Sequence, residues 1–142
     1  MLRKDAKVEL ISHVPLFASC SKGDLRKIAS LADEIDLPEG KVLIREGDRG
    51  REFFVLVEGR VDVSAKGRSV KTLQDGDFFG EMALVSDAPR NATVTALTPL
   101  RLLVITDRDF RGLLHDSPSI QLKVLQTLAN RLAELVDLGL YQ

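Results

Sequence analysis

The sequence of 142 residues predicts an α+β fold, in which a region of short antiparallel strands lies between two helical regions. Apolar residues recur at helical spacing before residue 33 and after residue 107. Between these regions, short β-type runs alternate with turn residues, which is typical of a sandwich or barrel of antiparallel strands. A chain of this length fits one domain with one proper core, so we treat residues 1–142 as a single domain.

The first helical region is predicted over residues 1–32. A modest helical pattern over residues 5–14 ends at Pro15, because proline terminates helices. Ser21 and Asp24 then resemble a capping box, which marks the start of a second helix. The apolar stripe of this second helix follows, at Leu25, Ile28, Ala29 and Ala32.

The strand region is predicted over residues 33–106. Its seven runs are 33–37, 41–45, 52–57, 60–65, 69–73, 92–97 and 100–106. Turn residues separate them, and three glycines are expected to supply positive φ angles between strands: Gly59, Gly67 and Gly76. The core of this region is predicted from the apolar residues Val42, Ile44, Phe53, Phe54, Val61 and Val63. Some of these side chains should also line a ligand pocket, since such pockets are largely apolar.

The second helical region is predicted over residues 107–138. Pro118 separates a short helix around Phe110 from a longer one. The longer helix carries two overlapping apolar seams, one at Leu122, Leu125, Ala129, Leu132 and Val136 and the other at Leu125, Leu128, Leu132 and Leu135. An apolar face this wide can serve the core of the domain and a second contact as well.

Composition restricts the class of protein. The net charge is −1, so no strong field favours nucleic acid or a membrane surface. The apolar runs are too short to span a bilayer, and the first residues lack the apolar run of a signal peptide. The single cysteine, Cys20, forms no internal disulfide and suits a reducing compartment. We therefore expect a cytoplasmic protein that binds neither nucleic acid nor membranes.

The segment from Phe78 to Val94, FFGEMALVSDAPRNATV, combines residue types that suit a small phosphorylated ligand. Gly80 allows a ligand to approach the backbone closely, and the turn that follows it offers unpaired N–H groups to an anion. Arg90 carries a planar guanidinium that can bind a phosphate with two parallel hydrogen bonds. Glu81 is a poor phosphate ligand, but its carboxylate can accept a hydrogen bond from a sugar hydroxyl.

This segment resembles the phosphate-binding cassette of the cyclic nucleotide-binding domain family. The matching residues are Phe79, Gly80, Glu81, Met82, Ala83, Leu84, Pro89, Arg90, Ala92, Thr93 and Val94, and the resemblance extends from about His13 to about Leu135. It implies an antiparallel β roll, jelly-roll-like, flanked by N-terminal helices and two C-terminal helices. It also implies that Glu81 accepts the ribose 2′-hydroxyl, that Arg90 pairs with the cyclic phosphate, and that the backbone of residues 80–83 donates N–H groups. The predicted nucleotide-binding residues are Phe79, Gly80, Glu81, Met82, Ala83, Arg90, Asn91 and Ala92.

Two of these residues also have structural interpretations. Glu81 could simply complement the dipole at the start of a helix. Arg90 could form an ion pair with Asp77, Asp87 or Glu81. The combination of Gly80, Glu81 and Arg90 favours the ligand interpretation for both residues, since a buried arginine without an anion is costly.

The base preference and the residue over the base stay open. Family members commonly carry Ala, Ser or Thr after the arginine, where a hydroxyl is associated with a preference for guanine. Asn91 offers both a donor and an acceptor at this position, so we favour cAMP over cGMP only weakly. Arg131 and Leu135 are candidates for a lid over the base, although Arg131 could equally be a solvated partner of Glu134.

The residues for catalysis are missing from the sequence. The two histidines, His13 and His115, lie outside the strand region, so neither a metal cluster nor a nucleophilic triad is credible there. The sequence also lacks the glycine-rich loops of nucleotide hydrolases and dehydrogenases. We therefore predict a protein that is not an enzyme and uses neither a metal nor a cofactor.

The sequence thus predicts a cyclic nucleotide sensor that signals through movement of its C-terminal helix, to a partner protein or to a second copy. The alternative is a dimerisation or protein-interaction module with an unused or structural pocket. Whether the chain is part of a longer protein stays open.

Overall fold

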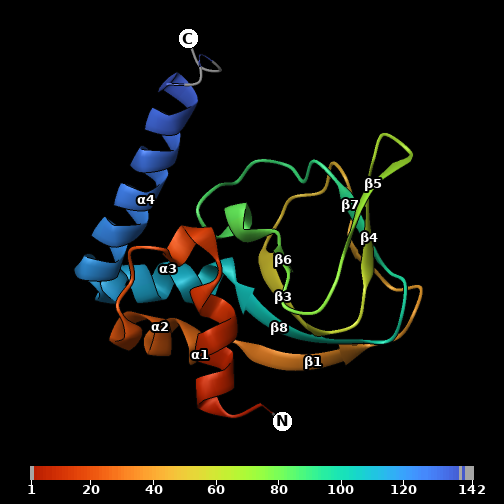
Figure 1. Ribbon diagram of the computed structural model, residues 1–142, viewed down its shortest axis with the longest axis horizontal. Helices are drawn as coiled ribbons and strands as arrows, with labels where there is room; N and C mark the ends of the chain where they lie inside the picture. The colour runs from red at the N-terminus through yellow and green to blue at the C-terminus, as the bar shows by residue number, and fades with distance from the viewer. Residues whose placement is uncertain (1, 138, 140–142) are drawn as a thin grey trace.

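The computed structural model describes residues 2–137 and 139, without the side chains of Arg131 and Leu135. Helices gather on one side of two β-sheets, which together form a roll (Figure 1). The predicted order of helices, strands and helices is therefore confirmed.

The N-terminal helices follow the predicted pattern with one addition. Helix α1 covers Lys4–Ser12 and α2 covers Lys22–Ala29. The capping box is present, since the Asp24 amide donates to Ser21 Oγ over 3.1 Å and the Ser21 amide donates to the Asp24 carboxylate over 2.9 Å. The addition is a short 3-10 helix, η1, at Pro15–Phe17, which the pattern before Pro15 does not predict.

Each sheet has four strands, and all pairings between neighbours are antiparallel. The first sheet has the order β1 (Asp33–Leu37), β8 (Leu100–Thr106), β3 (Glu52–Glu58) and β6 (Phe78–Phe79). The second has the order β2 (Val42–Ile44), β7 (Thr93–Ala96), β4 (Val61–Ala65) and β5 (Arg68–Leu73). Seven of these strands match the predicted runs, whereas the two-residue β6 was not predicted. Gly59, Gly67 and Gly76 have the predicted positive φ angles.

The core has two parts, one on each side of the first sheet. Beneath the helices, Phe17 lies with its ring centroid 6.2 Å from Phe53 and 5.6 Å from Phe110. Between the two sheets, a second cluster contains Phe54, Leu56 and the predicted core residues Ile44, Val61 and Val63. Phe53 and Phe54 are both buried and therefore belong to the core, as predicted, whereas Val42 is partly exposed.

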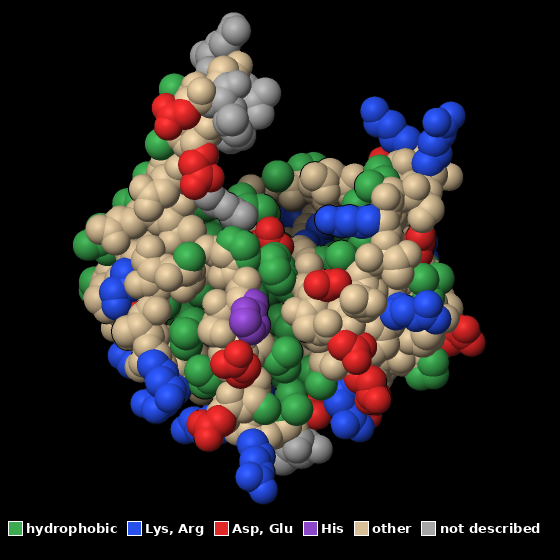
Figure 2. Space-filling model, in the orientation of Figure 1, with side chains coloured by type: hydrophobic (Ala, Val, Ile, Leu, Met, Phe, Trp, Pro, Cys, Tyr) green, Lys and Arg blue, Asp and Glu red, His purple; other side chains and the backbone are tan. Residues whose placement is uncertain are grey.

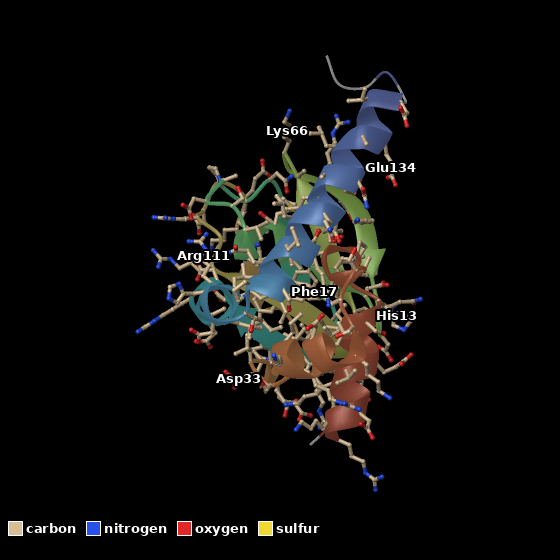
Figure 3. The ribbon with its side chains drawn as sticks, turned by 90° about the vertical axis from the view of Figure 1, so that its left-hand side faces the viewer. His13, Phe17, Asp33, Lys66, Arg111 and Glu134 are labelled. Atoms are coloured by element: carbon tan, nitrogen blue, oxygen red, sulfur yellow. The ribbon has the colours of Figure 1, made fainter. Side chains whose placement is uncertain are left out.

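Two helices close the chain, α3 at Asp107–Asp116 and α4 at Pro118–Asp137. The first turns of α4 pack on the domain through Ile120 and Val124, and Phe17 of η1 lies beneath this helix (Figure 3). The rest of α4 extends away from the roll (Figure 1). Leu122, Leu125, Leu132 and Val136 are exposed, so much of the first predicted seam faces away from the core. Over the described part of the chain, no helix combines the length and the apolar character needed to cross a membrane.

Candidate functional site

Arg90 is held in place by the loop that joins β2 to β3. Its carbonyl accepts a hydrogen bond from the Gly47 amide, and its own amide donates to the Asp48 carbonyl, both over 2.7 Å. The guanidinium donates to two further carbonyls, from Nη1 to Gly80 over 3.2 Å and from Nη2 to Glu52 over 2.5 Å. Two hydrogen bonds therefore hold the backbone of Arg90 at the head of β7, and two more hold its guanidinium.

Two glycines make room for this guanidinium. A Cβ atom at Gly50 would lie 2.6 Å from Arg90 Nε, and one at Gly80 would lie 2.7 Å from Arg90 Nη1. Gly80 also has a φ of 81°, a backbone conformation that residues with side chains rarely adopt. The arginine thus lies directly against backbone on two sides.

The guanidinium is half-buried and lacks a carboxylate partner. In the described part of the chain, no acidic oxygen lies within 4.0 Å of it. Burial lowers the pKa of Arg90, while the nearby charges of Glu52 and Glu81 act in the opposite direction. Two carbonyls accept two of the five N–H donors of the guanidinium, which leaves donors for an anion.

The predicted ion-pair alternative for Arg90 is therefore wrong. Asp87 pairs instead with Arg49 of the β2–β3 loop and Arg111 of α3, each over 3.2 Å. These contacts lower the pKa of the exposed Asp87 carboxyl, chiefly through the hydrogen bond from Arg111. Asp87 thus connects the segment before Arg90 to α3, and it leaves the guanidinium of Arg90 free for another anion.

Gly80 begins a 3-10 turn, η2, at Glu81–Leu84. The Ala83 amide donates to the Gly80 carbonyl over 3.1 Å and is occupied within the turn. The amides of Glu81 and Met82 come earlier and have no acceptor inside the turn. The turn therefore occupies one of the amides predicted to bind an anion and leaves those of Glu81 and Met82 without an acceptor inside it.

A hollow of about 460 Å³ lies between these residues and the inner face of the second sheet. Figure 2 shows it as a depression between the helical side and the β4–β5 hairpin. Six predicted residues line it: Phe79, Gly80, Glu81, Arg90, Asn91 and Ala92. Met82 and Ala83 line an adjoining hollow of about 390 Å³, which shares Gly80, Glu81, Arg90 and Asn91 with the first. The structure therefore brings all eight predicted residues together.

Lys71, Leu73 and Asp77 also line the larger hollow and were not predicted as site residues. The alternation within run 69–73 contains the signal for two of them, because residues 71 and 73 share one face of a strand. The lid candidates cannot be placed in this way, since the side chains of Arg131 and Leu135 lie outside the described residues.

Comparison with known proteins adds three findings. Residues 34–117 match the sequence model of the cyclic nucleotide-binding domain. The chain is 39% identical over 123 residues to a cyclic nucleotide-gated potassium channel of Rhizobium etli, a match that covers 87% of this chain and 34% of the channel. Its fold is similar to that of the N-terminal domain of a transcriptional regulator from Streptomyces coelicolor, with a TM-score of 0.83, 28% identity, and 93% and 96% of the two chains covered.

A second solved structure shows the regulatory domain of Toxoplasma gondii PKA with cAMP. It matches with a TM-score of 0.70 and 32% identity, over 77% of this chain and 43% of the other. The chain thus spans about a third of the channel and less than half of the kinase regulatory domain. One domain type is shared by a channel, a transcriptional regulator and a kinase regulator.

Proposed function

This chain belongs to the cyclic nucleotide-binding domain family, and from this premise we propose that it binds a cyclic purine nucleotide as a regulatory sensor, with cAMP favoured over cGMP and without catalysis. The observation that carries the proposal is the arrangement around Arg90. Its guanidinium is held by backbone carbonyls and has no carboxylate partner among the described residues. A bound phosphate would supply the missing negative charge.

Each part of the nucleotide has a counterpart in the hollow. The cyclic phosphate binds the free donors of Arg90 and the amides of Glu81 and Met82. The Glu81 carboxylate accepts the ribose 2′-hydroxyl, and the base lies against the apolar inner face of the second sheet. Asn91, next to Arg90, can reach either a phosphate oxygen or the edge of the base.

The cAMP preference rests on the relatives, because the apolar face of the hollow does not distinguish the two purines. The Toxoplasma gondii domain was solved with cAMP. Three apolar residues, Ile44, Val63 and Val94, line the hollow and would contact either purine equally. The cytoplasmic location stays a prediction from the sequence.

The proposed output is movement of α4. A nucleotide that binds better when α4 covers the base shifts the population toward that closed state. The exposed residues Leu122, Leu125, Leu132 and Val136 would then pass the change to a partner protein or a second copy. The same seam supports the second candidate function, a dimerisation module whose pocket is not used.

The test is a calorimetric titration of the chain with cAMP, followed by competition with cGMP. We expect binding, and we expect Arg90→Ala to weaken it by roughly 2–5 kcal/mol, because the substitution leaves the bound phosphate without its partner. Arg26→Ala, which removes an exposed arginine of α2, is the matched control and should keep the wild-type affinity.

Two outcomes would contradict the proposal. If neither nucleotide binds the wild-type chain, the dimerisation module becomes the better interpretation. If Arg90→Ala lowers the affinity less than threefold, Arg90 is not the phosphate ligand.

A further inference from the structure

Helix α4 has two halves that differ in how they contact the domain. Ile120, Val124 and Thr127 of the first half are buried. From residue 129 to residue 137, every side chain that the structure describes is exposed. One continuous α-helix spans both halves (Figure 1). The boundary between them therefore lies inside α4 and not at its junction with α3.

Two polar contacts hold the first half on the N-terminal helical region. The Lys123 ammonium binds the Asp24 carboxylate of α2, and the hydroxyls of Ser19 and Thr127 are hydrogen-bonded over 3.2 Å. Lys123 and Thr127 are four residues apart, so both contacts lie on the same face of α4. Apolar residues of α4 are buried on this face as well. Moving the first half would thus break both polar contacts and expose apolar surface at the same time.

The region that holds the first half is itself packed on the first sheet. Phe17 of η1 lies with its ring centroid 6.2 Å from that of Phe53 in β3. Leu25 and Ile28 of α2 belong to the same buried cluster as Phe53 and the buried apolar residues of α4. The first half of α4 is therefore part of the core of the domain.

The last polar contact coincides with a part of the helix that bends easily. Thr127 Oγ1 donates to the Lys123 carbonyl over 3.1 Å, and a threonine bonded in this way often bends a helix. Asn130 follows, and asparagine is a poor helix former. A hollow of about 320 Å³ on this side of α4 is lined by Pro15 of η1 and by Asn130 and Glu134. The helix after Thr127 thus has space beside it and a sequence that favours a bend.

We propose that α4 has a pivot at residues 128–130, so that residues 118–127 stay on the domain with or without nucleotide and only residues 129–137 move when it binds. The inference rests on the proposed function, in which α4 is the output, and adds to it the place where the helix bends. The alternative is a swing of the whole helix about Ser117, between α3 and α4, which would break both polar contacts.

The pivot divides the exposed apolar seam into two parts. Leu122 and Leu125 precede it and would keep their positions, whereas Leu132 and Val136 follow it and would move with the nucleotide. Only the second pair could then report the ligand to a partner.

The experiment fixes the first half with a disulfide. Ser19→Cys with Thr127→Cys places two sulfur atoms where two hydroxyls now lie 3.2 Å apart, and Cys20→Ser in the same chain removes the competing thiol. The same protein is measured oxidised and reduced, so the reduced form is the matched control for the oxidised one. Titration of free thiols measures the cross-linked fraction, and the melting temperature reports whether the protein is folded. The Cys20→Ser variant alone controls for the oxidant and the reductant.

We expect the oxidised and reduced forms to bind cAMP with affinities within about twofold of each other, because the cross-link joins groups that stay together in both states. In both forms, saturating cAMP should slow amide exchange in residues 129–137 and leave residues 119–127 nearly unchanged. The wild-type chain should show the same boundary, which tests the pivot without any substitution.

Three results would overturn the inference while leaving nucleotide binding intact. An oxidised form that binds cAMP about tenfold more weakly than its reduced form would show that the whole helix must move. In the wild-type chain, exchange that slows equally in residues 119–127 and 129–137 would show the same, even if the disulfide does not form. Unchanged exchange throughout α4 at full occupancy would exclude movement of either half. A wild-type chain that does not bind cAMP would instead refute the proposed function and the inference together.

Discussion

The position of Arg90 depends on a residue without a side chain in a distant loop. Gly50 precedes Arg90 by 40 residues, and a Cβ atom there would lie 2.6 Å from Arg90 Nε and 2.7 Å from Cζ. The φ angle of Gly50 is not in the left-handed region, so the backbone accepts alanine and the arginine must move. Gly50 is therefore a positioning residue for the phosphate site.

This geometry predicts that Gly50→Ala weakens cyclic nucleotide binding about tenfold with little loss of stability. The displaced guanidinium would lose part of its hydrogen bonding to the Gly80 and Glu52 carbonyls and no longer meet the phosphate in the bound geometry. Calorimetric titration of this variant measures its affinity for the nucleotide, and a thermal melt measures its stability. Gly112→Ala is the control, because a Cβ atom in that part of α3 would contact nothing within 4 Å. The control should raise the melting temperature slightly and keep the wild-type affinity. Full affinity in Gly50→Ala would show that the arginine has more room than this structure indicates.

The residues of the site differ in how far the sequence could predict them. Gly80, Glu81 and Arg90 stand within eleven residues of one another, and their combination of types indicates the chemistry directly. Gly50 has no such signal, because its role is the space it leaves in the folded state. Lys71 carries a weak signal, the alternation of β5, but the register that turns it inward depends on pairing with β4.

Among the elements, α2 and α4 are joined by a partly buried ion pair. The Lys123 ammonium binds the Asp24 carboxylate, which also accepts the Ser21 amide of the capping box. Asp24 is 7% exposed. The hydrogen bond from Lys123, and then that from Ser21, lower the pKa of Asp24, although desolvation opposes them.

Asp24→Asn should therefore reduce the free energy of unfolding by about 1.5–3 kcal/mol at neutral pH, the usual value of a hydrogen bond to a charged group. Since the folded-state pKa lies below the unfolded-state value, the stabilisation is complete above the ordinary pKa of an aspartate and is lost as the pH falls through the folded value. The difference in the free energy of unfolding between variant and wild type should thus become smaller below about pH 4. Urea unfolding at several pH values measures it, with Asp33→Asn, an exposed aspartate in β1, as the control. A difference that does not depend on pH would assign the effect to packing or capping instead of charge.

The elements that the sequence missed share a physical reason. The strand β6 has two residues and the helix η1 has three, so neither is long enough to show a period of its own. Both exist because of tertiary contacts: Phe79 pairs with Phe54 across the first sheet, and Phe17 packs on Phe53 and Phe110. Most of the longer runs were predicted because they carry a face that the core buries. The strand β5 is an exception, since none of its residues is buried, and the turn residues on either side of it indicate it instead.

For the molecule as a whole, the sequence predicted the order of helices and strands but not the course of α4. Its two seams predicted an apolar face wider than the core needs. The structure shows that the domain buries only part of the apolar residues of this helix. Ile120 and Val124 are buried against the domain, whereas Leu122 and Leu125 are 55% and 60% exposed. Periodicity cannot predict which apolar residues of α4 are buried, because their burial depends on where α2 and η1 lie.

The structure shows α4 away from the hollow, and this arrangement predicts the effect of the ligand on the helix. No described residue of α4 lines either hollow, and the helix extends away from the roll (Figure 1). If nucleotide binding favours a state in which α4 covers the base, saturating cAMP should slow amide hydrogen exchange in residues 119–138. The change should be larger after Asn130 than near Ile120 and Lys123, because those two residues already hold the first turns on the domain.

Arg90→Ala under the same cAMP concentration is the control for this measurement, and it should show the exchange pattern of the free chain. Exchange that is unaffected in the wild type, under conditions where calorimetry shows full occupancy, would exclude α4 as the output. The exposed seam of Leu122, Leu125, Leu132 and Val136 would then favour constitutive association. In that case sedimentation should show a dimer whose population does not change with cAMP, whereas a sensor that signals through α4 should change its population of dimers or its affinity for a partner when the nucleotide binds.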